Sequence, residues 1–265
     1  MPSGALKLEI NDAVARITMA RAAKHNAFDD VLIAELSDVF ARAGSAEDVR
    51  VVVLEGEGKS FSTGADLGWM QRMADYSDVE NLADARALAG MMRALNEMPK
   101  PTIARVQGAA FGGGVGLVAA CDIAIASEAA SFCLSEVRLG LIPAVISPYV
   151  VEAIGARAAR RYFQTAERFD AVEAHRLGLV QEVVPPEQLD DRVAAMIATL
   201  LENGPAAMAA AKHLIRRVSA GAVDASMIED TARRIADIRA TGEGREGLSA
   251  FLEKREAAWR RTTKS

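Results

Sequence analysis

The chain has 265 residues, of which 51% are hydrophobic and 25% are charged. This composition is typical of a globular protein of one or two domains and excludes global disorder. The 31 basic and 36 acidic side chains leave a net charge of −5, which argues against a protein that coats nucleic acid. Two cysteines, Cys121 and Cys133, are too few for a disulfide framework, and three histidines leave little material for a zinc site, so we expect no metal.

Several features predict a cytoplasmic protein. Residues 1–10 show neither a long apolar segment nor the Arg-rich pattern of a transit peptide. No run of about 18 apolar residues is free of charge, so we expect no membrane span. The low cysteine count fits a reducing compartment.

The first two thirds of the chain predict strands, loops and helices in alternation. Alternating residues at Leu6–Ile10 and Val14–Met19, separated by Asn11-Asp12, predict a β-hairpin. Helical spacing predicts a helix over Val31–Ala43, after the possible caps Asp29 and Asp30. Further strands are expected at Val51–Leu54, Thr102–Val106, Ile123–Ala126 and Ser131–Cys133, and further helices at Val79–Met98 and Leu117–Ala120. The alternation predicts an α/β fold with largely parallel strand pairing.

The pattern changes after about Val184, where Pro185-Pro186 interrupts the chain. Only helices are expected beyond this point, at Gln188–Leu201, Ala206–Ser219, Ala225–Ala240 and Arg245–Arg260. We therefore expect a core over 1–184 and a helical region over 185–265 that packs on the core or on a partner subunit.

Two glycine-containing loops are the strongest local signals for a binding site. The cluster Gly108–Gly116 lies between a predicted strand and a predicted helix, and Phe61–Trp69 follows a predicted strand in the same way. Free N–H groups of such loops can bind negative charge, and two loops at the ends of neighbouring parallel strands could form an oxyanion hole. A structural turn remains the alternative for the glycine cluster, while the Rossmann pattern fits poorly and a P-loop is excluded.

The order of motifs along nearly the whole chain resembles the crotonase, or enoyl-CoA hydratase/isomerase, family. The motifs are Phe61–Leu67 (FSTGADL), Pro99–Ile103 (PKPTI), Gln107–Gly114 (QGAAFGGG), Cys121-Asp122 (CD), Phe132–Pro143 (FCLSEVRLGLIP), Ala171–Val184 (AVEAHRLGLVQEVV) and Gly247–Arg255 (GLSAFLEKR). The resemblance implies a crotonase-like spiral of β-β-α turns, with a C-terminal helical region that covers the core and makes trimer contacts. It also implies an acyl-CoA thioester substrate, no separate cofactor, and a homotrimer or hexamer.

The resemblance also assigns candidate site residues. Ala65 and Gly113 would donate the two N–H groups that hold the thioester oxygen. The coenzyme A contacts would fall at Lys24, Asn26, Ala27, Ala65, Asp66, Leu67, Gly68 and Gly113, with Lys254 as a candidate for a phosphate, possibly from a neighbouring subunit. A solvated helix charge is the alternative for Lys254.

Hydratases of this family usually carry two glutamates, and this chain keeps one. Glu136 matches the second of them, whereas Gly116 stands where the first would be. A half-buried Glu136 could have a raised pKa and act in acid–base catalysis, although a surface glutamate at a helix start is the alternative. The missing side chain at Gly116 would open space near Cβ of a bound enoyl thioester, where a branched substrate carries its substituent.

A second departure is Ala144–Pro148, which replaces a glycine-rich family segment. With Gly116 and Asp66–Met70, it resembles hydratases of the methylglutaconyl-CoA type, which act on 3-substituted glutaconyl-CoA in leucine or isoprenoid breakdown. The candidates for binding the distal carboxylate, by charge alone, are Arg72, Arg93 and Arg138. A surface position is the alternative for each of them.

The leading hypothesis is thus a hydro-lyase that adds water to the C2–C3 double bond of a 2-enoyl-CoA, such as 3-methylglutaconyl-CoA. A Δ3-Δ2-enoyl-CoA isomerase is the first alternative, because isomerases of the family also work with one glutamate. A non-catalytic acyl-CoA or RNA-binding protein is the second. The net charge and the lack of an interleaved aromatic and basic segment weigh against RNA.

Overall fold

The computed structural model describes residues 4–219 and 221–263, and its strands form two sheets. The six-stranded sheet has the order β1-β2-β3-β5-β7-β10, with β1 and β2 antiparallel and the remaining pairs parallel. Its strands are Leu6–Asn11, Val14–Met19, Val51–Gly56, Thr102–Val106, Ile123–Ser127 and Glu182–Val184. The four-stranded sheet has the order β4-β6-β8-β9, and its strands are Ser60–Ser62, Ala109–Phe111, Ser131–Cys133 and Phe169–Asp170.

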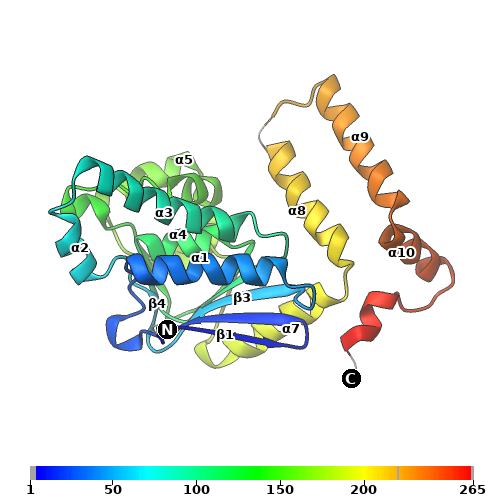
Figure 1. The fold of residues 1–265 in the computed structure, drawn as a ribbon, viewed down its shortest axis with the longest axis horizontal. Helices are drawn as coiled ribbons and strands as arrows, with labels where there is room; N and C mark the ends of the chain where they lie inside the picture. Colours follow the sequence, from blue (N-terminus) through cyan, green and yellow to red (C-terminus); the bar gives the residue numbers. More distant parts are fainter. Residues whose placement is uncertain (1–3, 220, 264–265) are drawn as a thin grey trace.

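The chain builds these sheets as a spiral. Three successive turns each place one strand in the large sheet and the next strand in the small sheet, and then continue into helices (Figure 1). The pairs are β3 with β4, β5 with β6, and β7 with β8. The helices that follow them are α2 (Leu67–Met73) and α3 (Asp78–Asn96), α4 (Gly113–Ala120), and α5 (Ser147–Thr165). This arrangement confirms the predicted α/β spiral of β-β-α turns.

The strand β3 is apolar from Val51 to Leu54 because both faces of the large sheet are covered there. Val52 and Leu54 belong to the core that includes residues of α1 (Asp30–Ser45) and α3, whereas Val51 and Val53 pack with Leu189 of α7 (Leu189–Leu201). A strand buried on both faces has no reason to alternate polar and apolar residues. The helix α7, the first helix of the C-terminal region, therefore packs on the second face of the large sheet and forms a separate hydrophobic cluster there.

Several predicted elements agree with the structure to within a few residues. The hairpin β1–β2 turns at Asp12 and Ala13, both at positive φ, and the Asp29 side chain caps α1 by accepting from Leu32 N. The sequence analysis missed the three-residue strands β4 and β6, the helix α2, and the stretch from α5 through α6 (Ala171–Leu177). Such short strands carry too few residues to show a period, and glycines surround β6.

The predicted helix at Arg245–Arg260 is wrong at both ends. The helix α10 spans Gly242–Leu252, and the Thr241 side chain caps it by accepting from Gly244 N. Beyond its end Lys254 has a left-handed φ of 53°, and Arg255 N donates to Ala250 O at 3.0 Å. This local bond satisfies a terminal carbonyl group and turns the chain away from the helix axis.

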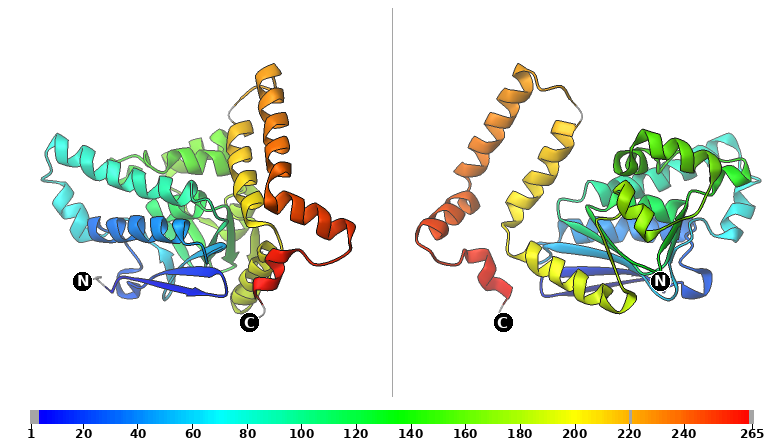
Figure 2. Two further views of the ribbon diagram at one scale, coloured as in Figure 1. Left: turned by 45° about the vertical axis from the view of Figure 1, so that its right-hand side comes forward. Right: turned by 180° about the vertical axis from the view of Figure 1, so that it is seen from behind.

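The helices α8 (Pro205–Ser219), α9 (Ala225–Ala240) and α10 lie to one side of the sheets, opposite to α2 (Figures 1 and 2). In α8 no residue is buried, while α9 and α10 bury only Met227 and Ala250. Within the described residues, no single helix has the length and apolar character to span a membrane. Two consecutive helical segments, Pro186–Leu201 and Pro205–Ser219, have the required length and apolar character only when taken together, and their axes are bent by 101°.

Candidate active site

Three neighbouring strands of the small sheet end in one place. The parallel strands β4, β6 and β8 lead at their carboxyl ends to Ala65, to Gly113 and to Glu136. Because consecutive turns of the spiral supply adjacent strands, residues far apart in sequence meet at one edge of the sheet. The two glycine-containing loops of the sequence analysis therefore do come together.

The contact between these loops is close. A Cβ atom on Gly64 would lie 3.4 Å from the backbone nitrogen of Gly113 and 2.9 Å from Phe111 O, and Gly64 has a φ of +82°. A larger residue would push the loops apart. Phe28 contacts both loops. Its backbone forms hydrogen bonds to Gly64 and Asp66, on either side of Ala65, and its ring fills the space beside Gly113.

The N–H groups of Ala65 and Gly113 take no part in the backbone bonds that join the loop to Phe28. Phe28 and Ala65 form an isolated parallel β-bridge, in which the hydrogen bonds use Gly64 O and Asp66 N. The N–H group of Ala65 is not used by this bridge. Gly113 is the first residue of α4, where N–H groups have no acceptor within the helix, and its N-cap Gly112 has no side chain to supply one. Both residues line the same cavity.

Glu136 begins a short 3₁₀ helix, Glu136–Leu139, directly after β8. Its Oε1 lies 3.1 Å from the position that a Cβ on Gly112 would take, so the carboxyl group lies against the glycine loop. Its Oε2 is buried and has no hydrogen-bond partner among the described residues. Burial raises the pKa of Glu136 above its usual range, as expected for a carboxyl group that acts in proton transfer.

Ala65, Gly113 and Glu136 line a cavity of about 680 Å³. Its walls are mostly apolar and come from α2, from α3 and from the segment 139–146. The polar side chains on the walls are those of Thr63, Asn81, Asp84, Ser135 and Glu136. A cavity of this kind, apolar with a few convergent polar groups, suits a small organic ligand.

The family model described as Enoyl-CoA hydratase/isomerase matches residues 9–262 of this chain. The chain belongs to this family. It is 34% identical over 215 residues to a hydroxycinnamoyl-CoA hydratase-lyase of Pseudomonas fluorescens, across 80% of this chain and 78% of that protein. Its activity is therefore an enoyl-CoA hydratase/isomerase activity on an acyl-CoA thioester.

Solved structures of the family agree with this assignment. An enoyl-CoA hydratase from Shewanella pealeana is 49% identical, with a TM-score of 0.94 over 96% of each chain. An enoyl-CoA hydratase/isomerase from Marinobacter aquaeolei is 36% identical, with a TM-score of 0.91 over 97% of this chain and 99% of that one. The crotonase-like fold predicted from the motifs is thereby confirmed.

The residues that the resemblance assigned to coenzyme A form a network next to Ala65. Asp66 caps α2 by accepting from Gly68 N at 2.9 Å and from Trp69 N at 3.3 Å, and Lys24 donates to its other oxygen at 2.7 Å. The hydrogen bond from Lys24 is the main reason that the pKa of Asp66 is lowered. Arg21 contacts the same oxygen at 3.4 Å. Lys24 and Asp66 thus hold the loop that carries Ala65.

The remaining residues of this set differ in their exposure. Asn26 is fully buried, and its side chain bonds to Arg21 N, Glu57 O and Ser60 O, so it shapes the loop from inside. Ala27 is also buried, whereas Leu67 is 77% exposed. Leu67 alone among these three presents a large apolar surface to the solvent.

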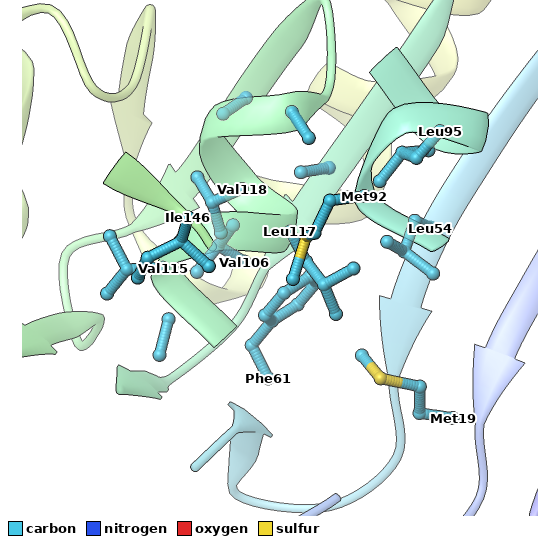
Figure 3. Close-up of a cluster of buried hydrophobic side chains, with 14 of the residues drawn as sticks. Met19, Leu54, Phe61, Met92, Leu95, Val106, Val115, Leu117, Val118 and Ile146 are labelled. Carbon is cyan, nitrogen blue, oxygen red and sulfur yellow. The ribbon is translucent and has the colours of Figure 1, made fainter. Parts of the chain in front are cut away.

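The expectation that Gly116 leaves open space is wrong. A Cβ atom there would lie 2.2 Å from Ile146 Cγ2 and 3.2 Å from Met92 Cε, and Gly116 does not line the cavity. Figure 3 shows Ile146 and Met92 within the cluster of buried side chains. The space of the missing side chain is therefore filled by packing within the protein.

The distant candidates do not reach the cavity. Lys254 follows α10, which lies on the side of the molecule opposite to α2 (Figure 1). Arg138 donates to Ala166 O at 2.6 Å, and Arg72 is paired with Asp30. Neither of these arginines lines the cavity, and nor does Arg93. In the described part of the chain, no group of three or more His, Cys, Asp or Glu residues could hold a metal ion.

The sequence analysis missed the cavity wall formed by α2 and α3. Trp69, Asn81 and Asp84 line the cavity, and Trp69 Nε1 donates to Asp84 Oδ1 at 3.1 Å. The predicted helix Val79–Met98 contained Asp84, but spacing alone gave no sign of which helix face meets the cavity. The polar residues Asn81 and Asp84 interrupt an otherwise apolar helix face, which marks that face without showing that it meets a cavity.

Proposed function

We propose that this protein is a hydratase that adds water across the C2–C3 double bond of a 2-enoyl-CoA thioester. The observation that carries the proposal is the meeting of Ala65, Gly113 and Glu136 at the ends of three neighbouring strands around one apolar cavity. The N–H groups of Ala65 and Gly113 hold the thioester oxygen, and Glu136 transfers the proton.

The two N–H groups act on the charge that develops during the reaction. Addition of water to C3 moves electron density through C2 onto the thioester oxygen, which becomes enolate-like. Donors already held in place stabilise this oxygen without reorganisation, and loss of one such donor typically costs about 2.7–4 kcal/mol of transition-state stabilisation. The close packing of Gly64, Gly113 and Phe28 keeps both donors in place.

One carboxylate can serve both proton steps. Ionised Glu136 takes a proton from water as the water oxygen bonds to C3, and the resulting carboxylic acid returns that proton to C2. Its buried Oε2 has no partner in the described structure and is available for this exchange. This route replaces the second glutamate, whose position is held by Gly116.

A Δ3-Δ2-enoyl-CoA isomerase is the second candidate, favoured by the single carboxyl group beside the donors. In that reaction Glu136 removes a proton from C2 and returns it at C4, and no water is added. A non-catalytic acyl-CoA or RNA-binding protein is the weakest alternative, since the family is catalytic and the net charge of −5 argues against RNA.

The coenzyme A portion would lie along the loop that follows β4. In this proposal Lys24, Asn26, Ala27 and the segment Ala65–Gly68 form that subsite, and Lys254 contacts a phosphate from a neighbouring subunit. Coenzyme A enters as part of the substrate, and no further cofactor is needed. A homotrimer or hexamer belongs to the same proposal, supported by the large exposed apolar residues of α8–α10. The cytoplasmic location stays a prediction.

The motif pattern also favours a 3-substituted glutaconyl-CoA, such as 3-methylglutaconyl-CoA in leucine or isoprenoid breakdown. Its distal carboxylate calls for a cation, and no Arg, Lys or His is among the described residues that line the cavity. One relative is named a hydroxycinnamoyl-CoA hydratase-lyase, and this name gives the acyl group a hydroxyl and no second carboxylate. The structure thus supports the 2-enoyl-CoA class more strongly than the glutaconyl group.

The experiment that tests the hydratase is an absorbance assay with crotonyl-CoA and with a 3-enoyl-CoA. Hydration removes the conjugated thioester absorbance of crotonyl-CoA, whereas isomerisation creates this absorbance from the 3-enoyl-CoA. We expect the first signal. Formation of absorbance from the 3-enoyl-CoA with no loss from crotonyl-CoA would instead establish the isomerase.

A further inference from the structure

Asp84 places a second carboxyl group on the part of the cavity wall that α2 and α3 form. It belongs to α3, and its Oδ1 accepts a hydrogen bond of 3.1 Å from Trp69 Nε1. Trp69 is only 3% exposed, so this bond fixes the carboxyl group against a buried ring. Asp84 is therefore oriented by the protein and is not a freely moving surface charge.

The cavity supplies no positive charge to balance it. Among the described residues that line the cavity, Asp84 and Glu136 are the charged ones, and both are acidic. The nearby cation Arg72 is paired with Asp30, and both side chains are about half exposed. Burial raises the pKa of Asp84 above its usual range, and the hydrogen bond from Trp69 and the charge of Arg72 oppose this rise.

The proposed hydratase function sets where the acyl group would lie in this cavity. With the thioester oxygen at Ala65 and Gly113, the C2–C3 bond lies at Glu136. Apart from the residues at the strand ends, the cavity is lined by α2, α3 and the segment 139–146, and these are the surfaces left for atoms beyond C3. The polar side chains that α2 and α3 contribute to this wall are Asn81 and Asp84, and its other residues there are Trp69, Met70, Met73, Ala85 and Leu88.

We propose that Asp84 is a specificity-determining residue that selects enoyl-CoA substrates with an uncharged acyl tail and rejects tails that end in a carboxylate. The proposal rests on the hydratase function, names its substrate class, and stands against the glutaconyl-CoA substrate that the motif pattern favours. Asp84 is partly buried, and two like charges side by side at such a site repel, so a carboxylate tail next to Asp84 would bind less well than a neutral one. A tail that carries a hydroxyl or amide N–H can instead donate a hydrogen bond to Asp84.

A matched pair of substrates tests this proposal. The pair is 3-methylglutaconyl-CoA and its terminal amide, which have nearly the same size and shape and differ in charge. We expect kcat/KM for the amide to exceed that for the carboxylate by roughly 10- to 100-fold in the wild-type protein. Asp84→Asn keeps an acceptor for Trp69 and removes the charge, so this preference should shrink by about the same factor.

The control is Asp78→Asn, which removes an exposed acidic group from the same helix outside the cavity. We expect the wild-type preference in this variant. A wild-type preference for the carboxylate, or a preference for the amide that is unchanged in Asp84→Asn, would overturn the proposal. If Asp84→Asn fails to fold, the wild-type preference alone decides, because equal rates on the two substrates contradict the proposal.

A binding measurement separates this proposal from the hydratase function. Calorimetric titration with glutaryl-CoA and with its terminal amide reports charge selection without any turnover. Weaker binding of glutaryl-CoA by roughly 10-fold or more is the expected result, and equal or tighter binding would overturn the role of Asp84. If no thioester is hydrated although the wild type shows this binding preference and Asp84→Asn loses it, the hydratase function fails and the selection by Asp84 stands.

Discussion

Ile146 occupies the space that a side chain at Gly116 would need. The Cγ2 atom of Ile146 lies 2.2 Å from the position of a Cβ at Gly116, and its own Cβ lies 2.8 Å from it. Both residues are buried, so neither can shift toward solvent. The glycine is therefore required by packing in the present core, with no positive φ involved.

We expect Gly116→Ala to lower the free energy of unfolding by about 1–3 kcal/mol, the usual cost of overpacking a core. Ile146→Ala removes the clashing atom, so the double variant should be more stable than the sum of the two single changes predicts. Chemical denaturation of the four proteins measures this coupling. Strictly additive effects would show that the two side chains do not compete for space.

Gly116→Glu should impair crotonyl-CoA and a 3-branched thioester alike. The glutamate has no open space to enter, and an unpaired carboxylate in the core is costly. Rates on both substrates and thermal unfolding of the variant check this expectation. Selective loss of the branched substrate in a well-folded variant would mean that the position faces the acyl group after all.

Glu136→Gln should lower kcat by about 10²–10⁴, the usual size of a general acid–base contribution. The amide keeps the shape of the side chain and cannot transfer the proton, so the affinity for a CoA ester should hardly change. Single-turnover rates and calorimetric binding measure the two effects. The matched control is Glu128→Gln, an exposed glutamate outside the cavity, and near-normal turnover in Glu136→Gln would remove this residue from the mechanism.

The raised pKa of Glu136 predicts two opposite trends with pH. For hydration the ionised form is needed, so kcat/KM should rise with pH through an apparent pKa above the usual 4.5. For stability the sign is reversed, because the folded state favours the protonated carboxyl group. Its contribution is present below the unfolded-state pKa and is lost as pH rises through the folded-state pKa.

Glu136→Gln should therefore be more stable than the wild type at pH 7, and this advantage should disappear toward pH 4. Denaturant midpoints at both values, with Glu128→Gln as the control, measure the difference. An advantage that persists unchanged at pH 4 would assign it to a cause other than the charge.

Asp66 combines a helix cap with ion pairs, and two variants separate these roles. Asp66→Ala removes both and should cost about 1–2 kcal/mol of stability. Asp66→Asn keeps a good cap and should cost less, while it loses the pairs with Lys24 and Arg21. Urea unfolding measures both, and equal losses would show that the ion pairs dominate.

The C-terminal helices predict an oligomer. Phe251 of α10 is 81% exposed, and Ile215 and Ile235 are also largely exposed, so these side chains need a partner to leave water. Sedimentation at micromolar concentration should give a trimer or hexamer, and Phe251→Asp should shift it toward smaller species. Thr199→Asp, at an exposed polar position of α7, is the control, and a wild-type monomer would contradict the expectation.

The sequence by itself determined the features that depend on local chemistry. Alternating residues and a turn specify the β1–β2 hairpin, and a continuous apolar run specifies β3. The short side chain of Asp29 specifies the start of α1. The ordered motifs also pointed to Ala65, Gly113 and Glu136, because glycines that permit close backbone contact and one retained carboxyl group can be seen in a linear sequence.

Only the tertiary structure decided how the space around these residues is filled. Ile146 follows Gly116 by a full turn of the spiral, so no local pattern could show that its side chain removes the expected opening. The same holds for Asp84, which reaches the cavity because α2 and α3 fold back over the strand ends. Packing joins residues that are distant along the chain, and the period of a helix shows that one face is buried without showing what that face meets.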